Sequence, residues 1–202
     1  MAEQLIISVS REFGSGGHTI AEQLAERFGL PLYDHNLLDK ITNEKNLDLK
    51  KLKQYDERPR NPLLSRTVRG YSNSPEENIA KMQFEYLQEK AEQGDSFVVV
   101  GRCSESVLKE YDSLIAIFIL ANMDFRIQRT MIKDGLSQRD AEALVKRRTR
   151  ERKAYHNRYC TMKWGDSRNY DITMDSSKLD IEGTADVLEN YIRARIKKKQ
   201  NG

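Results

Sequence analysis

Short apolar runs alternate along the chain with longer stretches in which apolar residues recur every three or four positions. The short runs are typical of buried strands. Five of them occur, at residues 5–9, 30–34, 96–100, 114–120 and 170–175. In the first long stretch, Ile20, Leu24 and Phe28 recur at helical spacing, and Gly29 follows where a helix commonly ends. Strands that alternate with helices and are apolar throughout predict an α/β fold with a central parallel sheet.

The other helical stretches are delimited by caps and stop signals. Residues 74–77 are Ser-Pro-Glu-Glu, a serine cap followed by proline and acidic residues in a first helical turn. They predict a helix that runs to about Gln93. Further helices are predicted at residues 35–46, 47–55, 123–134, 137–159 and 181–198. Residues 56–75 hold three of the four prolines and few apolar residues, so they predict a loop or irregular insertion and are a candidate for disorder.

Three glycines, Gly14, Gly16 and Gly17, lie between the first predicted strand and the first predicted helix. A glycine-rich turn at a helix N-terminus leaves backbone N–H groups available to bind phosphate. The P-loop consensus G-x-x-x-x-G-K-[ST] is nevertheless not met. Alignment on Gly16 puts Arg11 at the first glycine of the consensus. It puts Gly17 at the lysine and His18 at the serine or threonine.

The residue types of this loop still suit phosphate. The amide groups of Ser15, Gly16 and Gly17 can surround an anion, and Thr19 offers a hydroxyl one position later than the consensus does, as a candidate Mg²⁺ ligand. A cation must then replace the missing lysine, and the candidates are Arg11 and an arginine from a basic stretch further along the chain. A glycine-rich turn without any ligand is the alternative that stays open.

That basic stretch, residues 139–158, carries eight basic and three acidic side chains, an excess larger than the net charge of +3 of the whole chain. Such a cluster attracts phosphate on a mononucleotide or on a nucleic acid. Arg148 and Arg152 are four residues apart and share a helix face, which Tyr155 and Tyr159 extend. The stretch predicts a lid whose arginines neutralise a phosphoryl group, with a solvated basic helix as the alternative.

Composition limits the class of protein. The 202 residues are enough for one domain with a sizeable core, and the apolar runs argue against disorder although 32% of residues are charged. No run approaches the roughly 18 apolar residues of a membrane span. The N-terminal residues lack the pattern of a secretion signal, and two cysteines do not make a disulfide framework. The sequence therefore predicts a cytoplasmic protein.

Three stretches carry a resemblance to a known family: SREFGSGGHTIAEQLAERFGLPLYDHNLL, then VVVGRCSESVL, then RKAYHNRY…WGD…YDITMDSS. In this order they make the chain similar, over nearly its whole length, to the cytidylate kinase-like family of P-loop proteins. The resemblance implies a three-layer P-loop NTPase fold, in which helices flank a central parallel five-stranded sheet, as a single domain of residues 1–202. It also implies an acceptor-binding helical insertion at about 35–93, which is the monophosphate-binding region, and a helical lid at about 137–165.

The resemblance also implies roles for particular residues. The phosphates of the donor nucleotide would bind at Arg11, Gly14, Ser15, Gly16, Gly17, His18 and Thr19. Arg102 follows a strand, as does the acceptor-binding arginine of the family's G-R-D motif, but Cys103 stands in place of the aspartate. The lid would supply three catalytic arginines: Arg148, Arg152 and Arg158.

Four other features of the sequence bear on the site. Asp34 ends the second predicted strand, at the sheet edge where α/β proteins bind ligands, so it is a candidate acceptor-binding residue, with a helix cap as the equally good alternative. Trp164 is expected to pack against the base of the lid. Arg102 is expected to lower the pKa of the neighbouring Cys103 thiol. The three histidines show no metal-ligand spacing.

The leading hypothesis is a phosphotransferase that moves the γ-phosphoryl group of ATP, with Mg²⁺, to CMP, dCMP or a related small acceptor. A nucleotide-binding module without catalysis is the alternative, because the P-loop lysine is absent. A nucleic-acid-binding protein that uses residues 139–158 is less favoured, because the aromatic platform of single-strand readers is missing. The expected partners are small-molecule nucleotides and not a membrane, and the sequence leaves the oligomeric state open.

Overall fold

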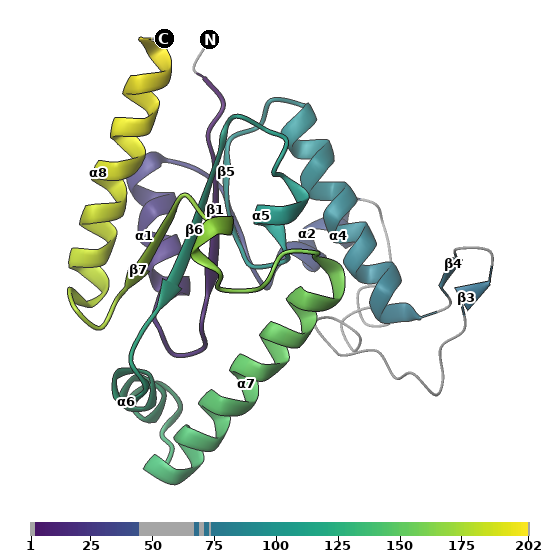
Figure 1. The fold of residues 1–202 in the computed structure, drawn as a ribbon. Coiled ribbons are helices and arrows are strands. Elements are labelled where there is room, and N and C mark those ends of the chain that lie inside the picture. Colours follow the sequence, from purple (N-terminus) through teal and green to yellow (C-terminus); the bar gives the residue numbers. More distant parts are fainter. Residues whose placement is uncertain (1–2, 45–66, 69–70, 73, 202) are drawn as a thin grey trace.

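The computed structural model of the chain describes residues 3–44, 67–68, 71–72 and 74–201. Its centre is a sheet of five parallel strands in the order β2-β5-β1-β6-β7 (Figure 1). These strands are β1 (Ile6–Arg11), β2 (Leu32–Tyr33), β5 (Phe97–Val100), β6 (Leu114–Leu120) and β7 (Ile172–Asp175). In this register Ile6 of β1 lies opposite Phe97 and Leu114. The five apolar runs thus form the predicted parallel sheet.

Helices cover both faces of the sheet and make three layers (Figure 1). One face is covered by α1 (Gly17–Phe28) and α8 (Asp180–Gln200), and the other by α2 (Leu37–Glu44), α4 (Pro75–Glu92) and α5 (Ser104–Val107). On the first face Leu24 and Leu188 share an apolar cluster with Val9. On the second, Leu87 shares one with Phe97. Burial from both sides explains why β5 and β6 are apolar throughout, whereas the half-buried strand β7 alternates apolar and polar residues.

Two further helices, α6 (Met123–Asp134) and α7 (Gln138–Tyr159), lie beyond the carboxyl ends of the strands, at the opposite end of the molecule from both termini (Figure 1). The side-chain oxygen of Asn122 accepts the N–H of Phe125 at 2.8 Å and so caps α6. The predicted Ser137 cap is confirmed, because its hydroxyl accepts the N–H of Asp140 at 3.2 Å. A short 3-10 helix, η1 (Ser167–Asn169), leads from this pair back to β7.

A small hairpin differs from the sequence-based expectation. β3 (Thr67–Val68) and β4 (Tyr71–Ser72) pair in antiparallel fashion within the segment 56–75, for which the prolines predict a loop. Two residue pairs are too few to leave an alternating pattern in a sequence. The helix predicted at 47–55 and most of the segment 56–75 lie outside the described residues.

The division into an acceptor-binding insertion and a lid stays a prediction. α2 and α4 belong to the first of these ranges, and α7 makes up most of the second. Within the described ranges, none of the helices combines the length and the apolar character that crossing a lipid bilayer requires.

Candidate functional site

The loop between β1 and α1 is shaped by neighbouring parts of the protein. Gly14 and Gly16 have left-handed backbone conformations, with φ of +83° and +80°. A side chain on Gly14 would meet the carbonyl oxygen of Arg126 at 2.8 Å, and one on Gly16 would run into Ile181 of α8. Glycine is therefore required at both positions by the backbone conformation and by the close approach of α6 and α8.

The N-terminus of α1 offers hydrogen-bond donors to an anion. The helix begins at Gly17 with Gly16 as its N-cap, no side chain caps it, and its first turn holds no acidic residue. The N–H of Gly17 makes only a long contact, 3.4 Å, with the hydroxyl oxygen of the buried Ser15, which itself donates to the carbonyl oxygen of Glu12 at 2.9 Å. The first-turn N–H groups, which have no carbonyl partner within the helix, and the positive end of the helix dipole favour an anion here.

Arg11, the last residue of β1, occupies the space next to Gly17. A Cβ atom on Gly17 would lie 2.5 Å from the Cβ and 3.0 Å from the Cγ of Arg11. The guanidinium group of Arg11 extends to Gly101, where an added Cβ would collide with its Nη1 atom. Relative to the P-loop consensus, the positive side chain thus enters from the position of the first glycine. The lysine position holds glycine because the arginine stem fills its space.

A hollow of about 100 Å³ lies beside this loop. Sites that enclose a whole ligand have volumes of roughly 300 Å³ or more, so this hollow would enclose only the phosphate end of a nucleotide. Its cationic lining residues come from β1, α6 and α7: Arg11, Arg129, Lys133 and Arg152. The carboxylates in the lining are those of Glu12 and Asp134. Seven of the predicted site residues line the hollow: Arg11, Gly14, Gly16, Gly17, His18, Thr19 and Arg152.

Arg126 of α6 connects the loop to two helices, and sequence reasoning missed it. The side chain is buried, its Nε atom donates to the carbonyl oxygen of Phe13 at 2.7 Å, and its Nη1 atom donates to Glu12 Oε2 at 3.0 Å. Its Nη2 atom donates to the hydroxyl of Thr149 on α7. One guanidinium therefore holds the loop backbone and the predicted lid together. Nothing in the sequence indicates it, because Phe13 is 113 positions away.

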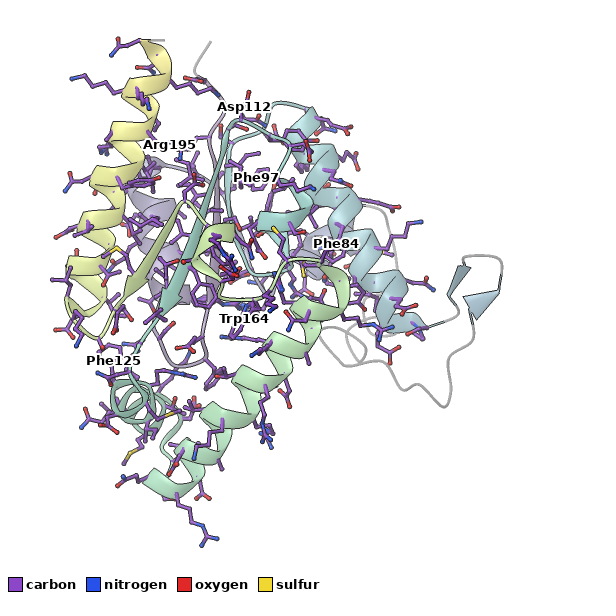
Figure 2. All side chains as sticks on the ribbon, viewed as in Figure 1. Phe84, Phe97, Asp112, Phe125, Trp164 and Arg195 are labelled. Atoms are coloured by element: carbon purple, nitrogen blue, oxygen red, sulfur yellow. The ribbon has the colours of Figure 1, made fainter. Side chains whose placement is uncertain are left out.

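Arg129 and Lys133 were also missed, although a signal for them exists. They are four residues apart on the helix that follows β6, so they share one helix face at the end of the sheet where ligands bind. Arg129 stacks on the ring of Phe125, which Figure 2 labels on α6, with its Cζ atom 5.8 Å from the ring centroid. Arg152 stacks in the same way on Phe13, at 5.2 Å. These ring contacts orient the two guanidinium groups.

The other two predicted catalytic arginines lie away from the hollow. Arg148 is exposed, and its Nη1 atom is 3.2 Å from Glu151 Oε2. Arg158, in the last turn of α7, pairs with Glu77 of α4. Neither of them lines the hollow. Of the three, only Arg152 is placed beside the loop, and the roles of the other two stay predictions.

The turn that carries Arg102 is strained. Gly101, Arg102 and Cys103 have φ of +73°, +60° and +54°. A left-handed conformation costs a non-glycine residue about 1–2 kcal/mol. The buried Arg102 donates from Nη1 to Oε1 of Gln83 on α4, at 3.2 Å. Backbone strain of this kind is concentrated at functional sites, and here it holds the Arg102 guanidinium on the α4 side of the sheet.

Asp34 follows β2 at the same edge of the sheet and is buried. Its Oδ2 atom lies 2.9 Å from Nε2 of His18 and 2.9 Å from Nδ1 of His35, while Oδ1 accepts the N–H of Asn36 at 2.9 Å. Burial by itself raises the pKa of this carboxyl, but the Asn36 N–H and His18 outweigh it and hold the pKa below its usual value. The carboxylate thus supports the turn before α2 and also faces the phosphate loop. Two histidines without metal-ligand spacing in the sequence meet here.

A cluster of buried ionisable groups lies where α7 ends, and we refer to its four members as the lid-foot cluster: Cys103, Glu105, His156 and Cys160. Burial opposes the charge on His156, but hydrogen bonds to Cys160 and Glu105 raise its pKa to about 10. Hydrogen bonds from Cys103 and His156 lower the pKa of Cys160 to about 6. Because Cys103 donates to Cys160, its own pKa is raised. The charge of Arg102 acts to lower the pKa of Cys103, as expected, but the hydrogen bond to Cys160 and burial outweigh it, so the pKa is raised and not lowered.

Trp164 packs at the base of α7, as predicted. Its ring makes an edge-to-face contact with Phe118, with centroids 5.2 Å apart, and shares a small apolar cluster with Tyr170. Its backbone N–H donates to Oδ1 of Asn157 on α7, at 3.1 Å. Figure 2 shows Trp164 beside α7 at the carboxyl end of the sheet.

The donor set at the hollow suits Mg²⁺ bound together with phosphates. Thr19, the predicted metal ligand, is in the lining. Mg²⁺ in proteins is commonly held by one or two carboxylates, by substrate phosphates and by water. The carboxylates at hand are Asp134 and Glu12, and Glu12 is already bound to Arg126. The residues therefore fit an ion whose ligands come mainly from a bound nucleotide.

Five parallel strands in three layers, with a glycine loop leading from β1 into a helix without a side-chain cap, define a P-loop kinase fold. The solved structure of shikimate kinase from Bacteroides thetaiotaomicron shares this fold, with a TM-score of 0.56 and 14% identity over 94% of this chain and 98% of that chain. Within this class, the chain belongs to the cytidylate kinase-like family, whose sequence model matches residues 6–178. The family inferred from the three sequence stretches is thereby confirmed.

The relatives are similar over almost the whole chain. Cytidylate kinase from Pyrobaculum aerophilum is 26% identical over 189 residues, which are 93% of this chain and 92% of that protein. Cytidylate kinase from Pyrococcus horikoshii is 26% identical over 192 residues, 94% of this chain and 89% of that protein. The crystal structure of an uncharacterized protein from Eubacterium ventriosum has a TM-score of 0.76 and 36% identity, covering 94% of this chain and 99% of that one.

Proposed function

We propose that this chain is an ATP-dependent phosphotransferase of the nucleoside monophosphate kinase type, which phosphorylates CMP, dCMP or a related small acceptor. The proposal rests on the arrangement of Arg11 and Gly17, in which the cationic side chain stands at the first glycine of the P-loop consensus and glycine stands at the lysine position. The cation absent from the lysine position is supplied from the end of β1, so the loop keeps the charge that phosphoryl transfer needs. The cytidylate kinases among the relatives support this class of acceptor.

In such a reaction an oxygen of the acceptor phosphate attacks the γ-phosphorus of ATP, the bond to the β–γ bridging oxygen breaks, and ADP leaves. The N–H groups at the start of α1 bind the donor phosphates. Arg11 and Arg152 neutralise charge on the transferring group from β1 and from α7. Arg129 and Lys133 add to the positive potential that attracts a polyphosphate. Mg²⁺, bound with ATP, would neutralise further phosphate charge.

The acceptor would bind at the α4 side of the same sheet edge. Arg102 would bind its phosphate and Asp34 would orient it. Cys103 replaces the aspartate of the family's G-R-D motif, so this position offers no carboxylate to a cytosine ring. Its thiol is instead hydrogen-bonded to Cys160. Arg158 would reach the phosphates only if the lid moved and its pair with Glu77 broke.

The direct test is ADP formation by the purified protein with ATP, Mg²⁺ and a panel of acceptors that includes CMP, dCMP, other nucleoside monophosphates and small hydroxylated acids. We expect turnover with CMP or dCMP. Turnover only with another acceptor would refute the assignment of CMP or dCMP as the acceptor, but the protein would still be a phosphotransferase. Stabilisation by nucleotide without turnover, about 2.7 kcal/mol at a hundredfold excess over Kd, would instead favour the non-catalytic nucleotide-binding module.

A variant pair tests this arrangement of Arg11 and Gly17. Gly17→Lys alone places a side chain against the stem of Arg11, and overpacking of this kind costs about 1–3 kcal/mol. The double variant Arg11→Gly/Gly17→Lys restores the consensus arrangement, so we expect it to recover stability and ADP formation relative to Gly17→Lys. If the double variant is no more stable and no more active than Gly17→Lys alone, Arg11 does not take the place of the P-loop lysine.

The nucleic-acid-binding hypothesis gains little support. Three basic side chains of α7 pair with acidic residues of the same helix: Lys146, Arg147 and Arg148. Arg158 pairs with Glu77, and Arg152 is directed to the hollow. The helix is therefore not a continuous basic surface, and steeply salt-dependent binding to an oligonucleotide is not expected.

A further inference from the structure

The lid-foot cluster combines the side-chain types that zinc prefers. Zinc is bound in proteins by thiolate, imidazole and carboxylate, and its structural sites have four ligands. Glu105, His156 and Cys160 each offer one ligand atom, these atoms lie within 4.8 Å of one another, and all three residues are buried. Cys103 lies outside this group of three, but its thiol is hydrogen-bonded to that of Cys160, which makes it the nearest candidate for a fourth donor. We propose that this cluster binds zinc through Glu105, His156, Cys160 and Cys103.

The backbone holds the four donors in two pairs. His156 lies in the last turn of α7, and Cys160, four residues later, is the C-cap of that helix. Cys103 is the N-cap of α5, and Glu105 follows in its first turn. Donors on two regular elements are held more precisely than donors on a long loop. The chain has two cysteines in all, and both are in this cluster.

Surrounding groups support the proposed ligands. Ser10 donates its hydroxyl to Glu105 Oε2 at 3.0 Å, and Nδ1 of His156 lies 3.4 Å from Oδ1 of Asn157. Partners of this kind orient metal ligands and tune their basicity. Ser10 immediately precedes Arg11 on β1.

Zinc at this position would be structural and would connect two parts of the candidate site. It would fasten the C-terminal end of α7 to the turn that holds Arg102. None of the four residues lines the hollow beside the phosphate loop, so the metal would not touch donor phosphates bound there. The zinc proposal is therefore independent of the proposed phosphotransferase activity, and its test needs no activity measurement.

A second group of possible ligands supplies an internal control. His18, Asp34 and His35 also bring their ligand atoms within 4.8 Å of one another. This group has no thiol, and the His35 side chain is 74% exposed. Thiolate-specific signals therefore distinguish the lid-foot cluster from it.

The test is a cobalt(II) titration of the full-length protein after reduction and treatment with a chelator. We expect one equivalent of cobalt to produce a thiolate-to-cobalt charge-transfer band together with the visible bands of tetrahedral cobalt. One equivalent of zinc should abolish these bands and protect both thiols from a thiol-reactive dye. Cys160→Ser should weaken cobalt binding more than tenfold, whereas the matched control His35→Asn should leave the bands unchanged.

Three outcomes would overturn the proposal: no charge-transfer band, cobalt binding by Cys160→Ser that is as tight as that of the unaltered protein, or thiols that react equally fast with and without zinc. If Cys160→Ser does not fold, the thiol-protection experiment on the unaltered protein decides. A Cys103–Cys160 disulfide that forms in air in the presence of stoichiometric zinc would also count against the site, because zinc-bound thiolates resist pairing.

Discussion

Two turns follow adjacent strands of the sheet, and both bend through left-handed backbone, but with different residues. The phosphate loop after β1 uses glycine at its left-handed positions, Gly14 and Gly16. The turn after β5 continues from Gly101 into Arg102 and Cys103, which carry side chains at the same conformation. The first turn avoids backbone strain, and the second accepts about 1–2 kcal/mol for each of two residues.

The difference indicates what each turn presents to a ligand. In the phosphate loop, Gly14 and Gly16 have no side chains, so α6 and α8 can approach closely and the backbone N–H groups are the atoms that bind a ligand. In the second turn the side chains themselves are needed. Arg102 is bound to Gln83, and Cys103 is hydrogen-bonded to Cys160. A loop that binds through its backbone needs cations from elsewhere, and Arg11 connects the two turns by reaching from Gly17 to Gly101.

The sharpest test of this comparison is the removal of the connecting cation. Arg11→Ala deletes the charge that stands in for the P-loop lysine, and arginines that neutralise a transferring phosphoryl group contribute about 10³-fold or more to kcat. We expect a loss of this size in ADP formation, measured with saturating ATP and acceptor. Arg150→Ala, at an exposed position on α7, is the control and should lose less than twofold. A full-rate Arg11→Ala variant would show that the cation comes from another residue.

Arg126→Ala tests the anchoring of the phosphate loop. The change leaves Glu12 and the Phe13 carbonyl without their buried partner and should lower the free energy of unfolding by about 3 kcal/mol. Urea denaturation followed by circular dichroism measures it. Lys133→Ala on the same helix, where the cation lines the hollow, should change stability by less than 0.5 kcal/mol. Equal stability of the two variants would mean that the loop does not depend on this anchor.

Arg102→Gly tests the strain in the second turn. Glycine relieves about 1 kcal/mol of left-handed strain, while loss of the bond to Gln83 costs a similar amount, so unfolding free energy should change by less than about 1 kcal/mol. The KM for the acceptor should nevertheless rise at least tenfold, with little change in the KM for ATP. A large loss of stability together with an unchanged acceptor KM would make Arg102 a structural residue only.

The smallest expected effect concerns Asp34 and pH. Its folded-state pKa lies below the unfolded value of about 3.9, so the carboxylate stabilises the fold above that pH, and the contribution is lost as pH falls through the lowered pKa. The stability advantage of the wild-type protein over Asp34→Asn should therefore be full at neutral pH and shrink in acid. Urea unfolding across a pH series measures it, with the exposed Asp124→Asn as the control. If the stability difference between the wild-type protein and Asp34→Asn grows as the pH falls, the pKa of Asp34 is not lowered in the folded state.

The pattern of apolar residues by itself determined the fold and the position of the phosphate loop. Runs such as 114–120 form strands because apolar residues without alternation must be buried on both sides, and this depends on local composition. The Ser137 cap and the position of Trp164 followed from sequence for the same reason. Local preference and burial are properties of neighbouring residues, so a sequence displays them directly.

Only the tertiary structure decided which side chains meet at the site. Arg11 excludes a side chain from Gly17, Arg126 holds Phe13, and Cys103 meets Cys160. The same holds for His18 and His35 at Asp34, and for the separation of Arg148 from Arg152. Such contacts depend on the relative placement of elements far apart in the chain, at distances of a few ångströms. Residue spacing fixes the face of a helix but not what packs against that face, and for that reason the cations of the site had to be found in three dimensions.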